Sequence, residues 1–205
     1  RRSSDLGFNA ERRAIAEMEA GLVNLVERLL DELGRRGGGD LIEDFAAAIP
    51  VEIIGNLLAV PPADRGPLRG WSLAILGALE PSLTPEQMAL GNRAVVDFKS
   101  YLGDLVRERR AHPGDPNHDV LTRLIQGDTQ ANGHTEHLSE LELLHNCIFL
   151  LNAGHETTTN LIGNGVQALM QHRDQLERLV ADPALLPSAV EELLRFESPL
   201  QLNNR

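Results

Sequence analysis

The sequence predicts a mainly α-helical protein. Apolar side chains recur at intervals of three and four residues, the spacing that lines one face of a helix. No segment shows the apolar and polar alternation of a half-buried strand. Aromatic residues make up only 3% of the 205 residues, so leucine, isoleucine, valine and alanine must build the core. The expected fold class is therefore a set of packed helices.

The first two predicted helices occupy residues 10–33 and 41–60. Gly34 and the glycines after it end the first helix, because glycine favours the backbone conformation that closes a helix. Asp40 can cap the second helix with its side chain. Pro50 has no N–H group to donate, so it should kink or divide the second helix.

A third helix is expected over residues 63–79, and a longer one follows it. Thr84, Pro85 and Gln87 combine a cap, a first-turn proline and a capping-box partner. This combination opens a helix that should run to about Arg110.

The longest predicted helix lies in the second half of the chain. A short helix over 119–126 and a polar connection over 127–138 precede it. Ser139 and Glu142 then make a second capping box, and no proline interrupts a helix over about 140–172. At 1.5 Å per residue this helix is about 50 Å long. Its middle is apolar on nearly all sides, which predicts burial through the centre of a larger body. Two shorter helices follow, over 173–180 and 187–196.

Composition excludes several classes of protein. The formal net charge of -11 argues against nucleic acid as the main partner. No stretch approaches the roughly 20 apolar residues of a membrane span, and the N-terminal sequence has no signal-peptide pattern. The single cysteine, Cys147, cannot form an internal disulfide, which agrees with a reducing compartment. The expected location is the cytoplasm, with no membrane partner.

Small and polar residues interrupt the apolar middle of the longest helix. Ala153 and Gly154 remove side-chain bulk, so a flat ligand could approach the backbone. The Thr157 hydroxyl can donate to the carbonyl four residues before it and loosen the helix locally. Glu156 places a carboxylate beside that hydroxyl. A groove, an alcohol and an acid are the parts needed to hold a diatomic ligand and relay protons to it.

The same residues permit a purely structural interpretation. Gly154 could serve close helix packing, and Thr157 could be a core threonine whose hydroxyl is satisfied within the helix. A zinc-protease motif beginning at His155 is excluded, because position 159 is threonine rather than histidine.

Two further polar pairs carry little information by themselves. His134 and His137 could bind a metal, but two histidines in a polar loop are usually solvated, and no metal site is expected in this chain. Glu192 and Arg195 share one helix face, an arrangement common among exposed ion pairs.

Taken together, these segments resemble the cytochrome P450 family. AGHETT at 153–158 matches the family's oxygen-binding motif, and the segment from Glu192 to Arg195, followed by FESP, matches its ExxR motif. Their order and separation resemble the bacterial members, residues 40–65 resemble the middle helices, and residues 1–8 resemble the end of a propionate-contacting helix. The resemblance covers essentially all of 1–205, which implies a single partial domain of central helices.

The resemblance implies roles for the motif residues. Ala153 and Gly154 would lie over the distal face of the haem. Thr157 would hydrogen-bond to the oxygen held there, and Glu156 would feed protons to it. His155 occupies the variable position of the motif and is expected not to be catalytic.

Four other residues receive roles from the same resemblance. Glu192 and Arg195 would be a structural pair, buried despite their charges. Arg1 and Arg205 look like propionate-contacting arginines.

The implied activity is that of a haem-thiolate monooxygenase. The complete enzyme would use haem b and O2 to hydroxylate a small hydrophobic organic substrate, with electrons from a ferredoxin or flavodoxin and its NAD(P)H-dependent reductase. The family's iron ligand is a cysteine in a loop well after ExxR, and this sequence ends before that loop, so the chain alone is expected to be inactive. The alternative is a non-catalytic helical module that has lost haem binding. The sequence beyond Arg205 would distinguish the two.

Overall fold

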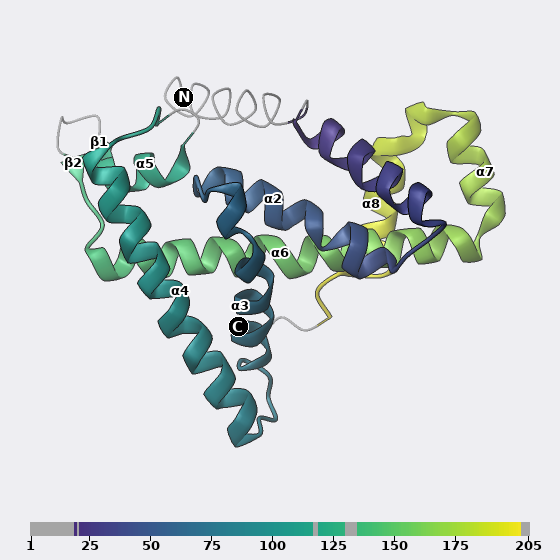
Figure 1. Ribbon diagram of the computed structural model, residues 1–205. Helices are drawn as coiled ribbons and strands as arrows, with labels where there is room; N and C mark the ends of the chain where they lie inside the picture. The colour runs from purple at the N-terminus through teal and green to yellow at the C-terminus, as the bar shows by residue number, and fades with distance from the viewer. Residues whose placement is uncertain (1–18, 20, 117–118, 130–134, 202–205) are drawn as a thin grey trace.

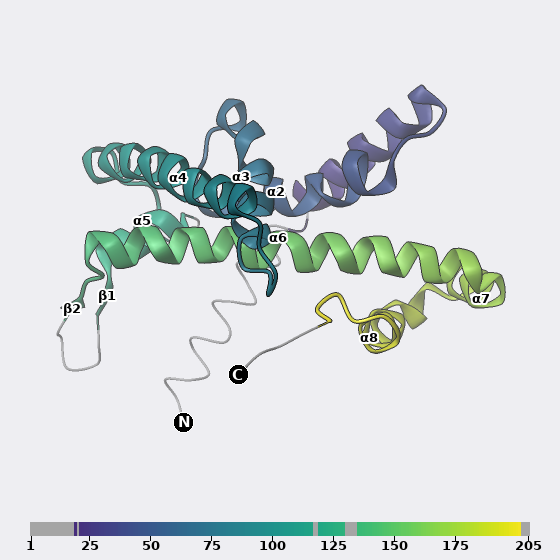
Figure 2. The ribbon, with the colours of Figure 1, turned by 90° about the horizontal axis from the view of Figure 1, so that it is seen from below.

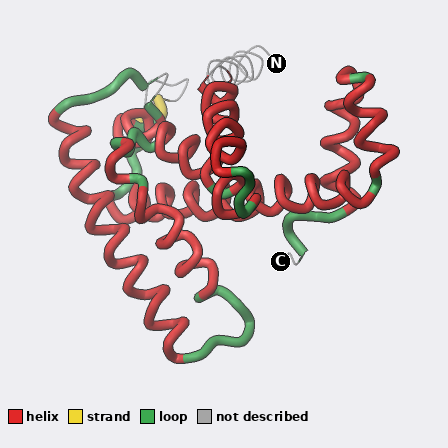
Figure 3. The backbone as a smooth tube through the Cα atoms, turned by 45° about the vertical axis from the view of Figure 1, so that its right-hand side comes forward, coloured by secondary structure: helices red, strands yellow, loops and turns green. Residues whose placement is uncertain are grey.

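The structure is a computed structural model that describes residues 19, 21–116, 119–129 and 135–201. Nearly all of this range is helix, and Figure 3 shows one short strand pair among the helices. The predicted fold class is therefore confirmed.

The first helix continues through Gly34 to residue 36, three residues past its predicted end at residue 33, before the glycines that follow end it. Residues 21–36 are helical, and Leu25 and Leu29 pack with Ile49 in a small core. The Asp40 side chain accepts hydrogen bonds from the N–H groups of Ile42 (2.8 Å) and of the next residue (2.9 Å), which confirms the predicted cap. A π-helical segment, η1 (Ile42–Ala46), follows.

Pro50 is accommodated near the start of α2 (Ala48–Leu57). The predicted second helix is divided at Ala47, between η1 and α2, rather than at the proline itself. Pro50 is the third residue of α2, where a backbone N–H would have no partner within the helix. The division thus places the proline where its missing donor costs little.

Helices α3 (Gly66–Gly77) and α4 (Pro85–Ala111) form a long antiparallel hairpin, which follows the short 3-10 helix η2 (Pro62–Asp64). Thr84 and Gln87 form the predicted capping box at the start of α4. The two helices approach closely at Gly91, where an added Cβ would lie 3.0 Å from the Ala74 carbonyl oxygen. Farther along, the rings of Trp71 and Phe98 stack with centroids 5.0 Å apart.

A short β-ladder separates α5 (Val120–Gln126) from the longest helix. Strands β1 (Asp128–Thr129) and β2 (Thr135–Glu136) pair in antiparallel register. The sequence analysis did not predict this ladder, since strands of two residues are too short to show alternation.

Helix α6 (Glu140–Gln171) is the central helix of the described chain, and most of the other helices pack against it. It contains 32 residues, which at 1.5 Å per residue is about 48 Å, and it begins at the predicted capping box of Ser139 and Glu142. Helices α2, α3, α4 and α5 pack along its first two thirds (Figures 1 and 2). Its last turns contact α7 (Arg173–Ala181) and, after the short 3-10 helix η3 (Pro183–Leu185), α8 (Leu186–Phe196).

The main core lies on one side of α6. Leu58, Phe98, Leu102 and Leu151 are fully buried in it. On the other side, Phe149 in the middle of α6 is 67% exposed. Helices of the described chain cover only one side of the middle of α6, so its burial on all sides within a larger body stays a prediction.

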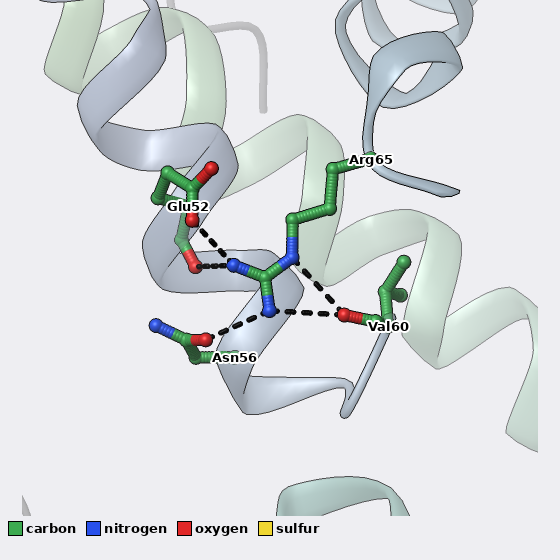
Figure 4. Close-up of polar contacts among 4 residues, drawn as sticks. All are labelled: Glu52, Asn56, Val60 and Arg65. Carbon is green, nitrogen blue, oxygen red and sulfur yellow. Dashed lines mark hydrogen bonds and ion pairs between the residues drawn. The ribbon is translucent and has the colours of Figure 1, made fainter. Parts of the chain in front are cut away.

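Arg65 joins the end of α2 to the start of α3 and is buried (Figure 4). Its Nε and Nη2 both donate to the Val60 carbonyl oxygen, at 3.0 and 2.9 Å. Nη1 forms an ion pair with the Glu52 carboxylate at 2.5 Å, and Nη2 donates to Asn56 Oδ1 at 2.8 Å. Gly55 makes room for this arrangement, since an added Cβ would lie 2.6 Å from Arg65 Nε. The guanidinium group thus fixes the angle at which the α3–α4 hairpin leaves α2.

We expect Arg65→Ala to lower the free energy of unfolding by roughly 3 kcal/mol, because it leaves a buried carbonyl and two polar side chains without their donor. Arg107→Ala is the matched control, since Arg107 is exposed and pairs with the exposed Asp104. The control should change stability by no more than about 0.5 kcal/mol. Urea unfolding measures both variants, and equal midpoints would contradict the role of Arg65.

Candidate functional site

The AGHETT segment lies within an unbroken stretch of α6. Thr157 Oγ1 donates to the Ala153 carbonyl oxygen at 2.9 Å, as its spacing predicted. Thr159 Oγ1 makes the equivalent bond to the carbonyl oxygen of His155, also at 2.9 Å. These bonds satisfy both hydroxyls without interrupting the helix, so no local break in α6 is present.

Ala153 and Gly154 are both small, but they face different surroundings. An added Cβ on Gly154 would lie 2.9 Å from Ile54 Cδ1, so this glycine lets α2 pack closely on α6. Ala153 is instead exposed, on the side of α6 that also exposes Phe149 and Glu156. The packing interpretation therefore accounts for Gly154, whereas no described neighbour requires the small size of Ala153.

The uncovered side of α6 has the chemistry of a site for a flat apolar group. An exposed aromatic ring, a small residue and a carboxylate follow one another at helical spacing, at Phe149, Ala153 and Glu156. Thr157 is half-buried at the edge of this side. We name these four residues, Phe149, Ala153, Glu156 and Thr157, the open face of α6.

His155, at the variable position of the motif, lies on the packed side of α6. Its side chain is only 1% exposed, and neither ring nitrogen has a hydrogen-bond partner among the described residues. Burial lowers the pKa of the ring, and the positive charge of Arg69 on α3 lowers it further. Leu151 and Thr159, one turn away on either side, are buried as well, so His155 belongs to the packed face of the helix.

Glu192 and Arg195 form a bidentate ion pair on α8. Arg195 Nε and Nη2 donate to the two carboxylate oxygens at 2.7 and 2.6 Å, and the guanidinium group lowers the pKa of Glu192. In the described chain the side chains are 70% (Arg195) and 58% (Glu192) exposed, so burial of the pair stays a prediction for the complete protein. The pair is exposed because α8 packs on α6 through Leu193, which approaches Gly165, and no described element covers the pair.

Cys147 is fully buried among the side chains of the main core. Burial raises the pKa of its thiol to about 12, so the thiolate that a metal requires is disfavoured. Burial of this kind is typical of a small, inert core cysteine. Arg1, Arg205 and His134 lie outside the described residues.

Two searches of the described chain bear on partners. No group of three or more potential metal-ligating side chains occurs among the described residues. Within the same residues, no helix combines the length and apolar character needed to cross a membrane.

Comparison with known proteins identifies the family. The family model of cytochrome P450 matches residues 79–183, which is about half of the chain. The chain belongs to the cytochrome P450 family. A cytochrome P450 of Priestia megaterium, CYP107DY1, is 36% identical over 193 residues, which are 94% of this chain and 45% of that protein. The steroid C26-monooxygenase of Mycobacterium tuberculosis (strain H37Rv) is 30% identical over 201 residues, 98% of this chain and 48% of that protein.

The fold of the chain also matches that of a solved P450 structure. The crystal structure of P450BioI, in complex with an acyl carrier protein ligated to hexadec-9Z-enoic acid, superimposes with a TM-score of 0.82 at 34% identity. The match covers 91% of this chain and 46% of P450BioI. The chain therefore spans about half the length of the P450 relatives that it matches.

We predict that His155 makes the stability of this P450 chain depend on pH. The unfolded imidazole titrates near pH 6.5, and its pKa is lower in the folded state. Below about pH 6.5 the unfolded state therefore binds more protons. The stability that neutral His155 contributes is complete above that pH and is lost as the pH falls toward the folded pKa.

The measurement is the urea midpoint of unfolding between pH 7.5 and 5. His155→Leu should flatten the decline by up to about 1.4 kcal/mol per pH unit. His145→Leu, a change at an exposed histidine on the same helix, should leave the decline as it is. A decline unchanged in His155→Leu would refute the assignment.

Proposed function

We propose that the complete protein is a cytochrome P450 monooxygenase and that this chain forms the distal wall of its haem pocket, as part of a single domain that includes 1–205. The observation that carries the proposal is the open face of α6, which presents an acid and an alcohol beside Ala153, within the family's oxygen-binding motif. Haem b, when bound, supplies the redox and oxygen chemistry of the reaction.

The residues of the open face fit a haem on geometric and chemical grounds. Ala153 leaves room for a flat ring, and the exposed Phe149 gives the same side an apolar surface. Thr157 has its hydroxyl tied to the Ala153 carbonyl, which leaves the oxygen lone pairs of that hydroxyl able to accept a further hydrogen bond. Glu156 is exposed one residue away and would exchange protons with solvent. Gly154 would contribute by keeping α2 close rather than by contacting the ring.

Other site residues enter the proposal through the family resemblance. Arg1 and Arg205 would contact the propionates of the haem. Glu192 and Arg195 would be structural, and their exposed bidentate pair is available to a segment that packs on α8. The iron ligand would be a cysteine other than Cys147, because Cys147 is enclosed in the core.

The substrate and the redox partners belong to the complete protein. We propose a small hydrophobic organic substrate, O2, and a ferredoxin or flavodoxin with an NAD(P)H-dependent reductase, in the cytoplasm. The names of two relatives support an apolar substrate, since one is a steroid monooxygenase and another was crystallised with a fatty-acyl carrier protein.

A second candidate function is a non-catalytic helical module. It is favoured by one observation, that the only thiol of the chain is buried with a raised pKa and unsuited to bind iron. The two candidates differ in whether the complete protein binds haem through a thiolate.

The carbon monoxide difference spectrum of the reduced, haem-loaded complete protein tests the main proposal. A thiolate-type Soret band is expected, and it should persist in Cys147→Ala, which keeps the core apolar. Absence of the band would favour the non-catalytic module. Loss of the band only in Cys147→Ala would contradict our placement of the iron ligand outside this chain's core.

We predict that Thr157→Ala uncouples electron use from product formation, because the distal site loses its hydroxyl. The measurement is hydrogen peroxide released per NAD(P)H consumed, which should rise while product per NAD(P)H falls. Thr157→Ser retains the hydroxyl and should remain coupled, and Thr158→Ala controls for loss of a neighbouring threonine. An unchanged ratio in Thr157→Ala would remove Thr157 from the site.

A further inference from the structure

Helices α3 and α6 carry buried polar atoms that have no hydrogen-bond partner among the described residues. On α3 these atoms are Arg69 Nε and Ser72 Oγ. On α6 they are Asn152 Oδ1 and both ring nitrogens of His155. The other nitrogens of Arg69 are occupied, since they pair with Glu43 at 2.5 and 2.6 Å.

These atoms gather at one place, the crossing of α3 and α6. Arg69 and Ser72 are three residues apart on α3, and Asn152 and His155 are three apart on α6, so each pair shares a helix face. Figures 1 and 2 show the first turns of α3 lying against the middle of α6, and the two helices are in contact. The positive charge of Arg69 lowers the pKa of the His155 ring, which agrees with this contact between the two helices.

Two of the four residues at the crossing are closed to bulk solvent, whereas the Arg69 side chain is 30% exposed. Ser72 is 0% and His155 is 1% exposed. Buried polar groups in folded proteins are nearly always hydrogen-bonded to protein or to ordered water, because an unpaired one retains its full desolvation cost. Several unpaired groups at one crossing therefore require a common partner.

The described side chains leave the imidazole unpaired. A neutral ring has one N–H donor and one acceptor nitrogen, on opposite edges. The Ser72 hydroxyl alone could serve one edge only. A partner that both donates and accepts is needed in addition.

We propose that the crossing of α3 and α6 contains a buried water site, in which ordered water bridges the His155 ring to the Ser72 hydroxyl. A buried water typically makes about three hydrogen bonds, and Asn152 Oδ1 and Arg69 Nε–H supply a further acceptor and donor. The guanidinium of Arg69 disfavours a cation in this place. The water site attaches α3 to His155. It thus links the α3–α4 hairpin to the turn of α6 that presents Thr157.

A crystal structure of the complete protein tests the proposal directly. A density peak is expected within about 2.7–3.2 Å of a His155 ring nitrogen and of Ser72 Oγ. A dry crossing in which the ring contacts only carbon atoms would overturn the proposal. A direct hydrogen bond between His155 and Ser72, with no peak beside the ring, would overturn it as well.

A double-mutant cycle in the complete protein gives a second, independent test. His155→Leu and Ser72→Ala each strand the remaining polar groups, so each should raise the unfolding equilibrium constant about tenfold or more. The double variant should raise it by much less than the product of the two, because the stranded partners are removed together. Independent effects of the two changes would refute a shared site.

The control is the same cycle with His145→Leu in place of His155→Leu, since His145 is exposed on α6. No coupling to Ser72→Ala is expected there. The cycle measures unfolding, and the crystal shows water, so neither result depends on the proposed haem chemistry. The water site and the monooxygenase function can therefore fail separately.

Discussion

The need to bury one side of a single 32-residue helix organises this P450 chain. Leu143, Cys147, Leu151, His155 and Thr159 form a nearly continuous buried stripe on α6. Helices α2, α3 and α4 all pack on the first two thirds of that helix, and the main core lies between them. Apolar burial is the dominant favourable contribution to folding, so α2, α3 and α4 are positioned by packing against this stripe. The opposite side of α6 is not part of the main core.

The AGHETT motif in the middle of α6 has residues on both the packed side and the uncovered side of the helix. Gly154 and His155 face the packed helices, where one admits Ile54 and the other lies at the crossing with α3. Ala153 and Glu156 face outward. A short sequence motif thus combines residues that pack against neighbouring helices with residues that face outward. The small size of Gly154 is explained by its contact with Ile54, whereas no described neighbour accounts for that of Ala153.

Arg65 holds the start of the α3–α4 hairpin against the end of α2. Its guanidinium ties the end of α2 to the turn that precedes α3, and Gly55 leaves the space that it occupies. Near the other end of α3, Gly91 of α4 lets the two helices pack closely, since an added Cβ would lie 3.0 Å from the Ala74 carbonyl oxygen. The polar crossing with α6 lies between these two constraints. The hairpin is therefore held by specific close contacts and hydrogen bonds as well as by apolar burial.

Local signals in the sequence determined the helices and the family. The capping boxes at Thr84 and Ser139 and the cap at Asp40 act within one turn, so they could be read without the fold, and the starts of α4 and α6 and the Asp40 cap were correct. The tertiary structure alone decided which sides are covered: Phe149 is exposed, His155 is buried, and the pair of Glu192 and Arg195 is open to solvent. Periodicity shows that residues share a helix face, but the neighbour that covers that face comes from distant sequence, and only packing selects it.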